Sequence, residues 1–206
     1  MNILVIAPHP DDETIGCGGA LCLHAAKGDR VVVVFLTSGE LGLKELAPAK
    51  AWQVRESEAQ AAAKHLGITR LEFLRLPDWM VTEQIQKGAR LFSPILRREA
   101  PRLIYLPHLG EWHPDHQAAA PLLRAAIQRS RIAQPALRAY EIWTPLQEYD
   151  HTEDVSRVMA RKLRALCAYR SQLAEFDYER AIRGLNQYRG ALAGKCRYAE
   201  VFKTLD

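Results

Sequence analysis

Two segments of this chain, far apart in the sequence, repeat the same three residues, His-Pro-Asp. The first begins at His9 and continues into Asp12 and Glu13, and the second begins at His113 and ends at His116. Imidazole and carboxylate groups are good ligands for zinc and other divalent first-row metals. Adjacent aspartates in a tight turn, as in the first segment, repel each other unless a cation compensates their charge. The two segments together therefore indicate a metal site.

Each segment taken alone has an ordinary structural explanation. An Asp that follows Pro commonly begins a turn or a helix. A carboxylate such as Glu13 in the first turn complements the positive end of the helix dipole. Packing does not readily explain why the motif occurs twice. A shared metal site does explain it, but only if the fold brings the two segments together.

The rest of the chain alternates between predicted strands and predicted helices. Short apolar runs predict buried strands, and longer Ala-rich or amphipathic runs predict helices. The predicted strands are 3–7, 31–37, 71–76, 103–106 and 138–144. The predicted helices are 19–27, 51–66, 81–98 (broken or kinked at Pro94), 116–131 and 155–171. This alternation predicts an α/β fold, with a Rossmann-like, predominantly parallel sheet flanked by helices, in a single domain over residues 1–206.

Ligands of such sheets bind outside the carboxyl ends of the strands. Both His-Pro-Asp segments directly follow a predicted strand, so we expect them to converge on one rim. Glu40 and Asp78 also follow predicted strands, and both are candidates for contact with a substrate. Each has an alternative explanation as a simple loop or turn residue.

Three glycines near the first segment, Gly16, Gly18 and Gly19, invite comparison with a dinucleotide-binding turn. Their spacing is not G-x-G-x-x-G, and charged residues occupy the place of the phosphate turn. We interpret them as positions where a helix packs closely on the sheet. The rival reading, a nucleotide-binding module without catalytic activity, leaves the His and Asp residues unexplained.

The residues from Ala7 to Glu13, together with His113–His116, resemble the PIG-L/LmbE-type N-acetylglucosamine deacetylases. Thr37–Glu40 and the segments 189–190 and 198–202 add to the similarity, which spans nearly the whole chain. The resemblance implies an LmbE-like fold and a zinc-dependent hydrolase. Its expected reaction removes the acetyl group from an N-acetylated amino-sugar, such as an N-acetylglucosamine conjugate.

The resemblance also implies roles for the residues of the two motifs. His9, Asp12 and His116 would bind Zn²⁺ or another divalent metal, and Asp11 would be the general base that activates water. Residue types and spacing alone do not decide which of Asp11 and Asp12 is the ligand and which is the base.

Three further residues complete the expected site. A protonated His113 would stabilise the oxyanion, and Arg55 would be among the groups that hold the sugar. Asp115 is expected to orient a neighbouring imidazole, as carboxylates near metal ligands often do. The alternative function is a metal-dependent esterase or another amidase acting on a non-sugar substrate, because fold and motif do not fix the substrate.

The composition narrows the classes of partner. The net charge of +4 is spread over much of the chain rather than gathered in a basic stripe, so we do not expect a nucleic-acid partner. No run approaches the roughly 18 apolar residues of a membrane span, and the N-terminal run is too short for a signal peptide. We expect a cytoplasmic protein whose partner is a small amino-sugar conjugate. The sequence allows a homo-oligomer without indicating one.

Overall fold

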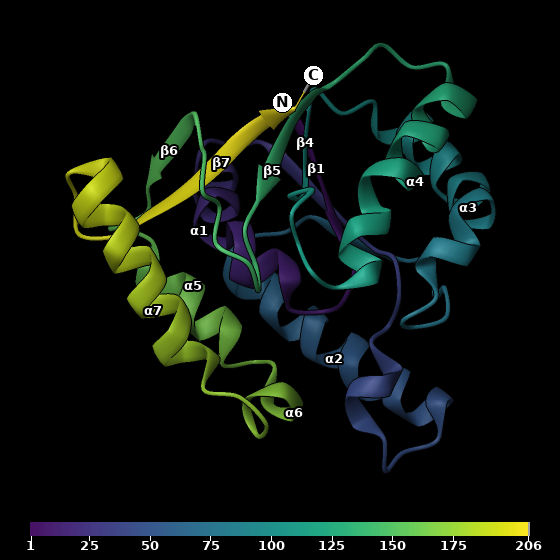
Figure 1. Cartoon of the computed structure of the whole chain (residues 1–206), viewed down its shortest axis with the longest axis horizontal. Helices are drawn as coiled ribbons and strands as arrows, with labels where there is room; N and C mark the ends of the chain where they lie inside the picture. Colours follow the sequence, from purple (N-terminus) through teal and green to yellow (C-terminus); the bar gives the residue numbers. More distant parts are fainter. Residues whose placement is uncertain (206) are drawn as a thin grey trace.

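The computed structural model describes residues 1–205 and shows a seven-stranded sheet with helices on both faces (Figure 1). The strands lie in the order β3-β2-β1-β4-β5-β7-β6. Neighbours from β3 to β5 pair in parallel, whereas β7 is antiparallel to both β5 and β6. The strands are β1 Asn2–Ala7, β2 Arg30–Phe35, β3 Arg70–Phe73, β4 Leu103–Pro107, β5 Ala136–Tyr140, β6 His151–Asp154 and β7 Ala199–Leu205. The predicted α/β fold with a mostly parallel sheet is confirmed.

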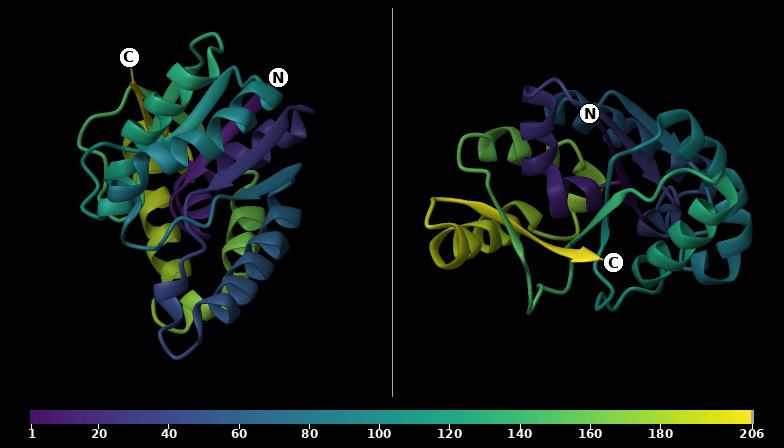
Figure 2. Two further views of the ribbon diagram at one scale, coloured as in Figure 1. Left: turned by 90° about the vertical axis from the view of Figure 1, so that its right-hand side faces the viewer. Right: turned by 90° about the horizontal axis from the view of Figure 1, so that it is seen from above.

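The helices form two layers, one on each face of the sheet. They are α1 Asp12–Ala26, α2 Pro48–Leu66, α3 Ile85–Glu99, α4 Pro114–Ser130, α5 Met159–Leu166, α6 Arg170–Leu173 and α7 Tyr178–Arg189, with short turns η1 Glu40–Leu43, η2 Val81–Gln84 and η3 Gly190–Gly194. Figure 2 shows α3 and α4 on one side of the sheet and α1, α5 and α7 on the other. No helix among the described residues is both long and apolar enough to cross a membrane.

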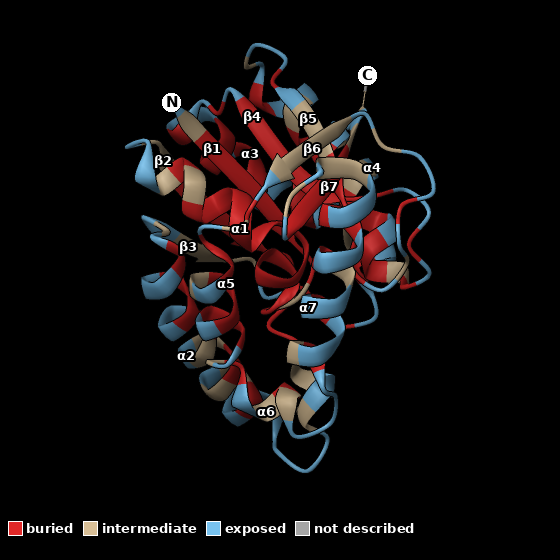
Figure 3. Cartoon of the chain, turned by 90° about the vertical axis from the view of Figure 1, so that its left-hand side faces the viewer, coloured by how far each residue is buried: buried red, intermediate tan, exposed pale blue. Residues whose placement is uncertain are grey.

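Alternation along the strands builds a core on each face. Successive side chains of a strand point to opposite faces. In β1, Ile3 and Val5 pack with the layer that contains α1, α2, α5 and α7, whereas Leu4 and Ile6 pack with α3 and α4. The central strands and α1 are therefore buried almost throughout (Figure 3). A sheet covered on both faces explains why its strands read as continuous apolar runs.

The glycines near the first motif lie inside α1, which begins at Asp12 rather than near Gly19. A Cβ atom on Gly16 would lie 2.1 Å from a ring carbon of Tyr140, and one on Gly19 would lie 2.5 Å from the side chain of Val155. The interpretation of close packing on the sheet is confirmed for Gly16, next to Tyr140 of β5, and for Gly19, next to Glu200 of β7. Gly18 instead faces Lys162 of α5. The first turn of α1 is thereby held at the end of β1, where the motif residues are.

A break or a kink was predicted at Pro94, and the break is wrong, because α3 continues unbroken through that residue. Proline removes one backbone donor and leaves the carbonyl four residues earlier without its helical partner. That carbonyl belongs to Arg90, and the hydroxyl of Ser93 donates to it at 3.4 Å. The interruption instead lies at the start of the predicted helix, where η2 precedes α3.

The last third of the chain differs most from the sequence prediction. The strand predicted over 138–144 ends at Tyr140, and the helix predicted over 155–171 is replaced by α5 and α6. The backbone N–H of Val155 donates to the carbonyl of Tyr198, which holds Val155 at the end of the β6–β7 pair rather than in a helix. No local pattern predicts this pairing.

Candidate metal centre and pocket

Both His-Pro-Asp segments meet at the carboxyl ends of β1 and β4, where the strand order reverses. Figure 1 places these two strands side by side at the centre of the sheet. His9 follows β1 and Asp12 opens α1, while His113 caps α4 and His116 lies in its first turn. A reversal of strand order is the usual ligand site of an open α/β sheet.

Three atoms at this point form a nearly equilateral triangle. Asp12 Oδ2 lies 3.3 Å from His9 Nδ1 and 3.3 Å from His116 Nε2, and the two ring nitrogens are 3.4 Å apart. Ligand atoms about 2.1 Å from a tetrahedral zinc lie about 3.4 Å from one another. The three side chains therefore fit one tetrahedral ion, whose fourth position they leave open.

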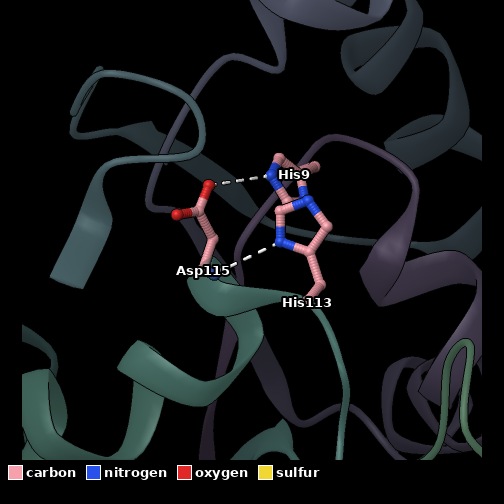
Figure 4. A group of neighbouring side chains, drawn as sticks. All are labelled: His9, His113 and Asp115. Carbon is pink, nitrogen blue, oxygen red and sulfur yellow. Dashed lines mark hydrogen bonds and ion pairs between the residues drawn. The ribbon is translucent and has the colours of Figure 1, made fainter.

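The other ring nitrogen of His9 faces two carboxylates. His9 Nε2 lies 3.0 Å from Asp78 Oδ1. It also lies 3.2 Å from Asp115 Oδ2 (Figure 4). A metal ligand must be the neutral imidazole. In that form the carboxylates accept a hydrogen bond from Nε2–H, so the Nδ1 lone pair points into the triangle. Asp115 also accepts bonds from the backbone N–H groups of Trp79 and Val81, at 2.8 and 3.0 Å.

His116 has a carboxylate partner that the sequence analysis did not single out, Glu111. Glu111 Oε2 lies 3.5 Å from His116 Nδ1, and both atoms are buried without a closer partner. Glu111 Oε1 accepts bonds from the backbone N–H groups of Ile142 and Thr144, at 2.9 and 3.2 Å. The carboxylate thus links the second motif to the segment after β5 and favours a proton on His116 Nδ1, which leaves Nε2 for the triangle.

The two adjacent aspartates have opposite electrostatic environments. Burial raises the pKa of Asp11 to about 7. The negative charge of Asp12 adds to this rise, whereas the positive charge of Arg55 opposes it. Burial also favours the neutral form of Asp12, but His116 and His9 outweigh it and hold the pKa of that carboxyl well below its usual value. Neighbouring carboxyls with separated pKa values are typical of a base and a fixed anion.

His113 differs from the expectation of a protonated imidazole. Burial, together with the charges of His9 and His116, lowers the pKa of His113 to about 4, so the neutral ring is the favoured form. The backbone N–H of Asp115 donates to His113 Nδ1 at 3.2 Å. The remaining proton therefore resides on Nε2, and a neutral His113 can still donate a hydrogen bond.

A pocket of about 290 Å³ opens over the triangle and contains most of the residues singled out in the sequence. Arg55 lines it although only 2% exposed, and its Nη2 donates to the carbonyl of Pro10 at 2.7 Å. Nε and Nη1 of Arg55 have no hydrogen-bond partner within residues 1–205. Asp78 also lines the pocket, whereas Glu40 lies behind it and accepts bonds from Asp78 N and Trp52 Nε1, both at 3.0 Å.

Four aromatic side chains form one part of the pocket lining, and we call them the aromatic wall: Trp79, Trp112, Trp143 and Phe176. Their ring centroids follow one another at 6.4, 6.5 and 5.7 Å, with interplanar angles of 55, 54 and 71°. The wall is therefore curved rather than flat. It begins beside His113, because the rings of Trp79 and His113 are 4.4 Å apart.

Comparisons with known proteins agree with this geometry. The family model described as GlcNAc-PI de-N-acetylase, PIG-L, matches residues 4–127. The diacetylchitobiose deacetylase of Thermococcus kodakarensis is 29% identical, over 97% of this chain and 81% of that protein.

Solved structures show the same fold. The conserved protein TT1542 of Thermus thermophilus superposes with a TM-score of 0.86 at 30% identity, over 99% of this chain and 94% of the other. The 4-carboxy-2-hydroxymuconate hydratase of Pseudomonas putida has a TM-score of 0.82 at 24% identity, over 100% and 97% of the two chains. The second likeness shows the fold alone, so the reaction must be argued from the site.

Proposed function

Because this chain belongs to the PIG-L family of de-N-acetylases, we propose that it hydrolyses the acetamide of an N-acetylated amino-sugar, releasing acetate and a free amine. The observation that carries the proposal is the triangle of His9 Nδ1, Asp12 Oδ2 and His116 Nε2, with Asp11 beside it. An N-acetylglucosamine conjugate is the substrate class that the family and the Thermococcus relative support.

We propose Zn²⁺ as the ion held by His9, Asp12 and His116. Two imidazoles and one carboxylate are a common ligand set of catalytic zinc, although other divalent first-row metals accept the same donors. When bound, the ion supplies Lewis-acid chemistry, which acidifies water and polarises the acetyl carbonyl.

Asp11 is proposed as the general base. Asp11 precedes the proposed ligand Asp12 in the sequence, but its own carboxyl is not part of the triangle. Its backbone φ of 124° is unusual for a residue other than glycine. Such conformations persist where the surrounding structure enforces them, often at functional sites. Asp11 accepts a proton from water as the water oxygen bonds to the carbonyl carbon. It then returns that proton to the nitrogen as the C–N bond breaks.

His113 is proposed to stabilise the oxyanion. With Nδ1 accepting from Asp115 N, its Nε2–H is free to donate to the carbonyl oxygen as negative charge develops there. A positioned donor of this kind contributes about 10²–10³ in rate. Arg55 and Asp78 are proposed to contact the sugar, and Asp115 to hold His9 in its ligating orientation. Glu40 is proposed to act through Asp78, whose backbone it holds.

The domain organisation and the cellular location are proposed from the sheet and from the cysteines. We propose one domain over residues 1–206, because one continuous sheet joins both cores. We propose a cytoplasmic location, since the four cysteines are all unpaired and thus fit a reducing compartment.

The test is acetate release from N-acetylglucosamine conjugates, measured together with metal content. Asp11→Asn should lower kcat by about 10²–10⁴-fold while retaining one metal per chain. Asp12→Asn should lose the metal as well as the activity. Full activity in Asp11→Asn would remove the base assignment. Hydrolysis of esters or non-sugar amides, without acetate release from any amino-sugar, would favour the alternative hydrolase.

A further inference from the structure

The aromatic wall takes no part in the hydrolysis described above, yet it is large and exposed. Trp79, Trp112, Trp143 and Phe176 are 50, 57, 39 and 52% exposed. Among the described residues one other large aromatic side chain, Tyr188, is exposed to this degree. Exposed aromatic surface is costly in water, so its concentration beside one pocket indicates a binding surface.

The lining of the pocket contains no aliphatic side chain among residues 1–205. Apart from the wall and Tyr178, the lining side chains are polar or glycine: His9, Asp11, Asp12, Gly39, Gly42, Arg55, Asp78, His113 and Gln172. An acyl chain offers only C–H groups and would leave these polar groups without partners. A sugar ring has an apolar C–H face that suits an aromatic ring and a polar edge that suits hydrogen-bonding groups.

The charges of the pocket argue for an uncharged ligand. Arg55 is the only lysine or arginine among the lining residues that the structure describes. It already donates to Pro10 and lies 3.5 Å from Asp11 Oδ2. A carboxylate or phosphate on the conjugate would therefore meet three buried aspartates, Asp11, Asp12 and Asp78. The guanidinium nitrogens of Arg55 that have no partner among the described residues, Nε and Nη1, are themselves buried. Away from the metal ion, the lining side chains therefore disfavour an anionic group.

The wall is fixed in position relative to the metal centre. Trp79 has a left-handed backbone, with φ of 66°, which is rare for a bulky residue. Its N–H donates to Asp115 Oδ2, the same oxygen that faces His9 Nε2. A single carboxylate thus holds both a metal ligand and the first ring of the wall. The volume of about 290 Å³ is at the lower end for small-molecule sites, so the rest of a longer substrate must lie along the exposed rings.

We propose that the aromatic wall is the binding site for a second, uncharged sugar ring attached to the N-acetylglucosamine that is deacetylated. This inference rests on the proposed function and narrows its substrate class to neutral oligosaccharides with at least two rings. Phe176 and Trp143, the members farthest along the wall from His113, are assigned as specificity-determining residues. They contact the second ring rather than the reacting acetamide.

The experiment compares three substrates on the zinc-loaded protein: N-acetylglucosamine, diacetylchitobiose and N-acetylglucosaminyl malate. The readout is the ratio of kcat/KM for the disaccharide to that for the monosaccharide. We expect the wild-type ratio to exceed about ten, and Phe176→Ala to lower it about three- to tenfold through KM, as for the loss of one aromatic contact. Tyr188→Ala, an equally exposed aromatic residue outside the pocket, is the matched control and should leave the ratio unchanged. Trp143→Ala should repeat the effect of Phe176→Ala.

Binding separates this proposal from the proposed function. Diacetylchitobiose should quench tryptophan fluorescence, with a dissociation constant weakened by Phe176→Ala and not by Tyr188→Ala. If no substrate releases acetate, the proposed function fails. The binding titration still shows whether the aromatic wall binds the disaccharide. The wall proposal is overturned if Phe176→Ala and Trp143→Ala leave both the ratio and the dissociation constant unchanged. Preference for the malate conjugate over the disaccharide would overturn it equally.

Discussion

Asp11 and Asp12 are neighbours in the sequence, yet their carboxyls face different partners. Asp12 contacts both imidazoles of the triangle, whereas Asp11 turns toward Arg55, whose Nη2 lies 3.5 Å from Asp11 Oδ2. The sequence could not distinguish the two, because their types are identical and their spacing from His9 differs by one residue. The backbone conformation at Asp11 is what separates the two side chains.

The raised pKa of Asp11 predicts an acidic limb in the pH profile. A general base works when deprotonated, so kcat/KM should fall about tenfold per pH unit below the pKa of this carboxyl. That pKa is about 7, and the charge of a cation bound at the triangle would lower it, so the midpoint should lie at or below about 7. The profile of the metal-loaded protein checks this, with metal content measured at each pH. A rate that stays constant from pH 7 down to pH 4 would contradict the base assignment.

Glu111→Gln should weaken metal binding about 10–100-fold, because the carboxylate partner of a ligating imidazole orients the ring and raises its basicity. The amide oxygen of glutamine can still accept the bonds from Ile142 and Thr144, so the fold should persist. Competition with a chromophoric chelator measures the affinity. Glu83→Gln, on the exposed turn η2, is the control. Equal affinities of Glu111→Gln and the wild type would show that His116 needs no such partner.

Sequence reasoning identified the residues of the triangle because they lie in two short motifs. It missed Glu111, although that residue lies only two positions before His113. The role of Glu111 depends on the loop after β4 reaching the segment after β5, where Ile142 and Thr144 donate to it. Such a contact joins parts of the chain that no local pattern connects.

At the scale of elements, α1 carries the first motif and depends on glycine to reach the sheet. Gly16→Ala should destabilise the protein by about 1–3 kcal/mol, because the added Cβ would overlap the buried ring of Tyr140. Gly184→Ala, in the middle of α7 with nothing within 4 Å of the added Cβ, should instead stabilise by about 0.5–1 kcal/mol. Urea unfolding of the two variants measures both changes. A neutral Gly16→Ala would mean that α1 can move away from β5 without cost.

The helices and strands that were predicted well are those that a short stretch of their own sequence indicates. The buried strands β1, β2 and β4 are continuous apolar runs, and α2 is Ala-rich with Gly67 at its end. No helix or strand was predicted after residue 171, yet that part of the chain contains α7 and β7. The strand β7 is recognised only through its partners β5 and β6, with which it pairs across long stretches of sequence.

At the scale of the whole molecule, one buried lysine joins the early and late parts of the chain. Lys162 Nζ donates to the carbonyl of Ile15 at 2.8 Å, to Asn186 Oδ1 at 2.8 Å and to Glu200 Oε1 at 2.7 Å. Glu200 also accepts from the backbone N–H groups of Gly19 and Ala20, at 2.7 and 2.8 Å. Four elements, α1, α5, α7 and β7, therefore share one polar cluster.

Lys162→Met should cost about 3–5 kcal/mol of unfolding free energy, because it leaves the charge of Glu200 buried without its cation. The control is Lys203→Met, which removes a lysine from an exposed pair with Asp150 and should change stability by less than about 0.5 kcal/mol. Chemical denaturation of both variants gives the comparison. If Lys162→Met were as stable as the control, the buried cluster would not hold the two parts of the chain together.

The position of β7 has a consequence for how this protein is made. On the ribosome the chain emerges from its N-terminus, and β5 and β6 are both synthesised before the strand that lies between them. Until residues 199–205 leave the exit tunnel, β5 forms an unpaired edge of the sheet, and Lys162 lacks its carboxylate partner Glu200. An unpaired edge of this kind invites aggregation. The nascent chain therefore completes its sheet only when synthesis of this last strand is finished, and chaperones that shield hydrophobic edges should engage it before that moment.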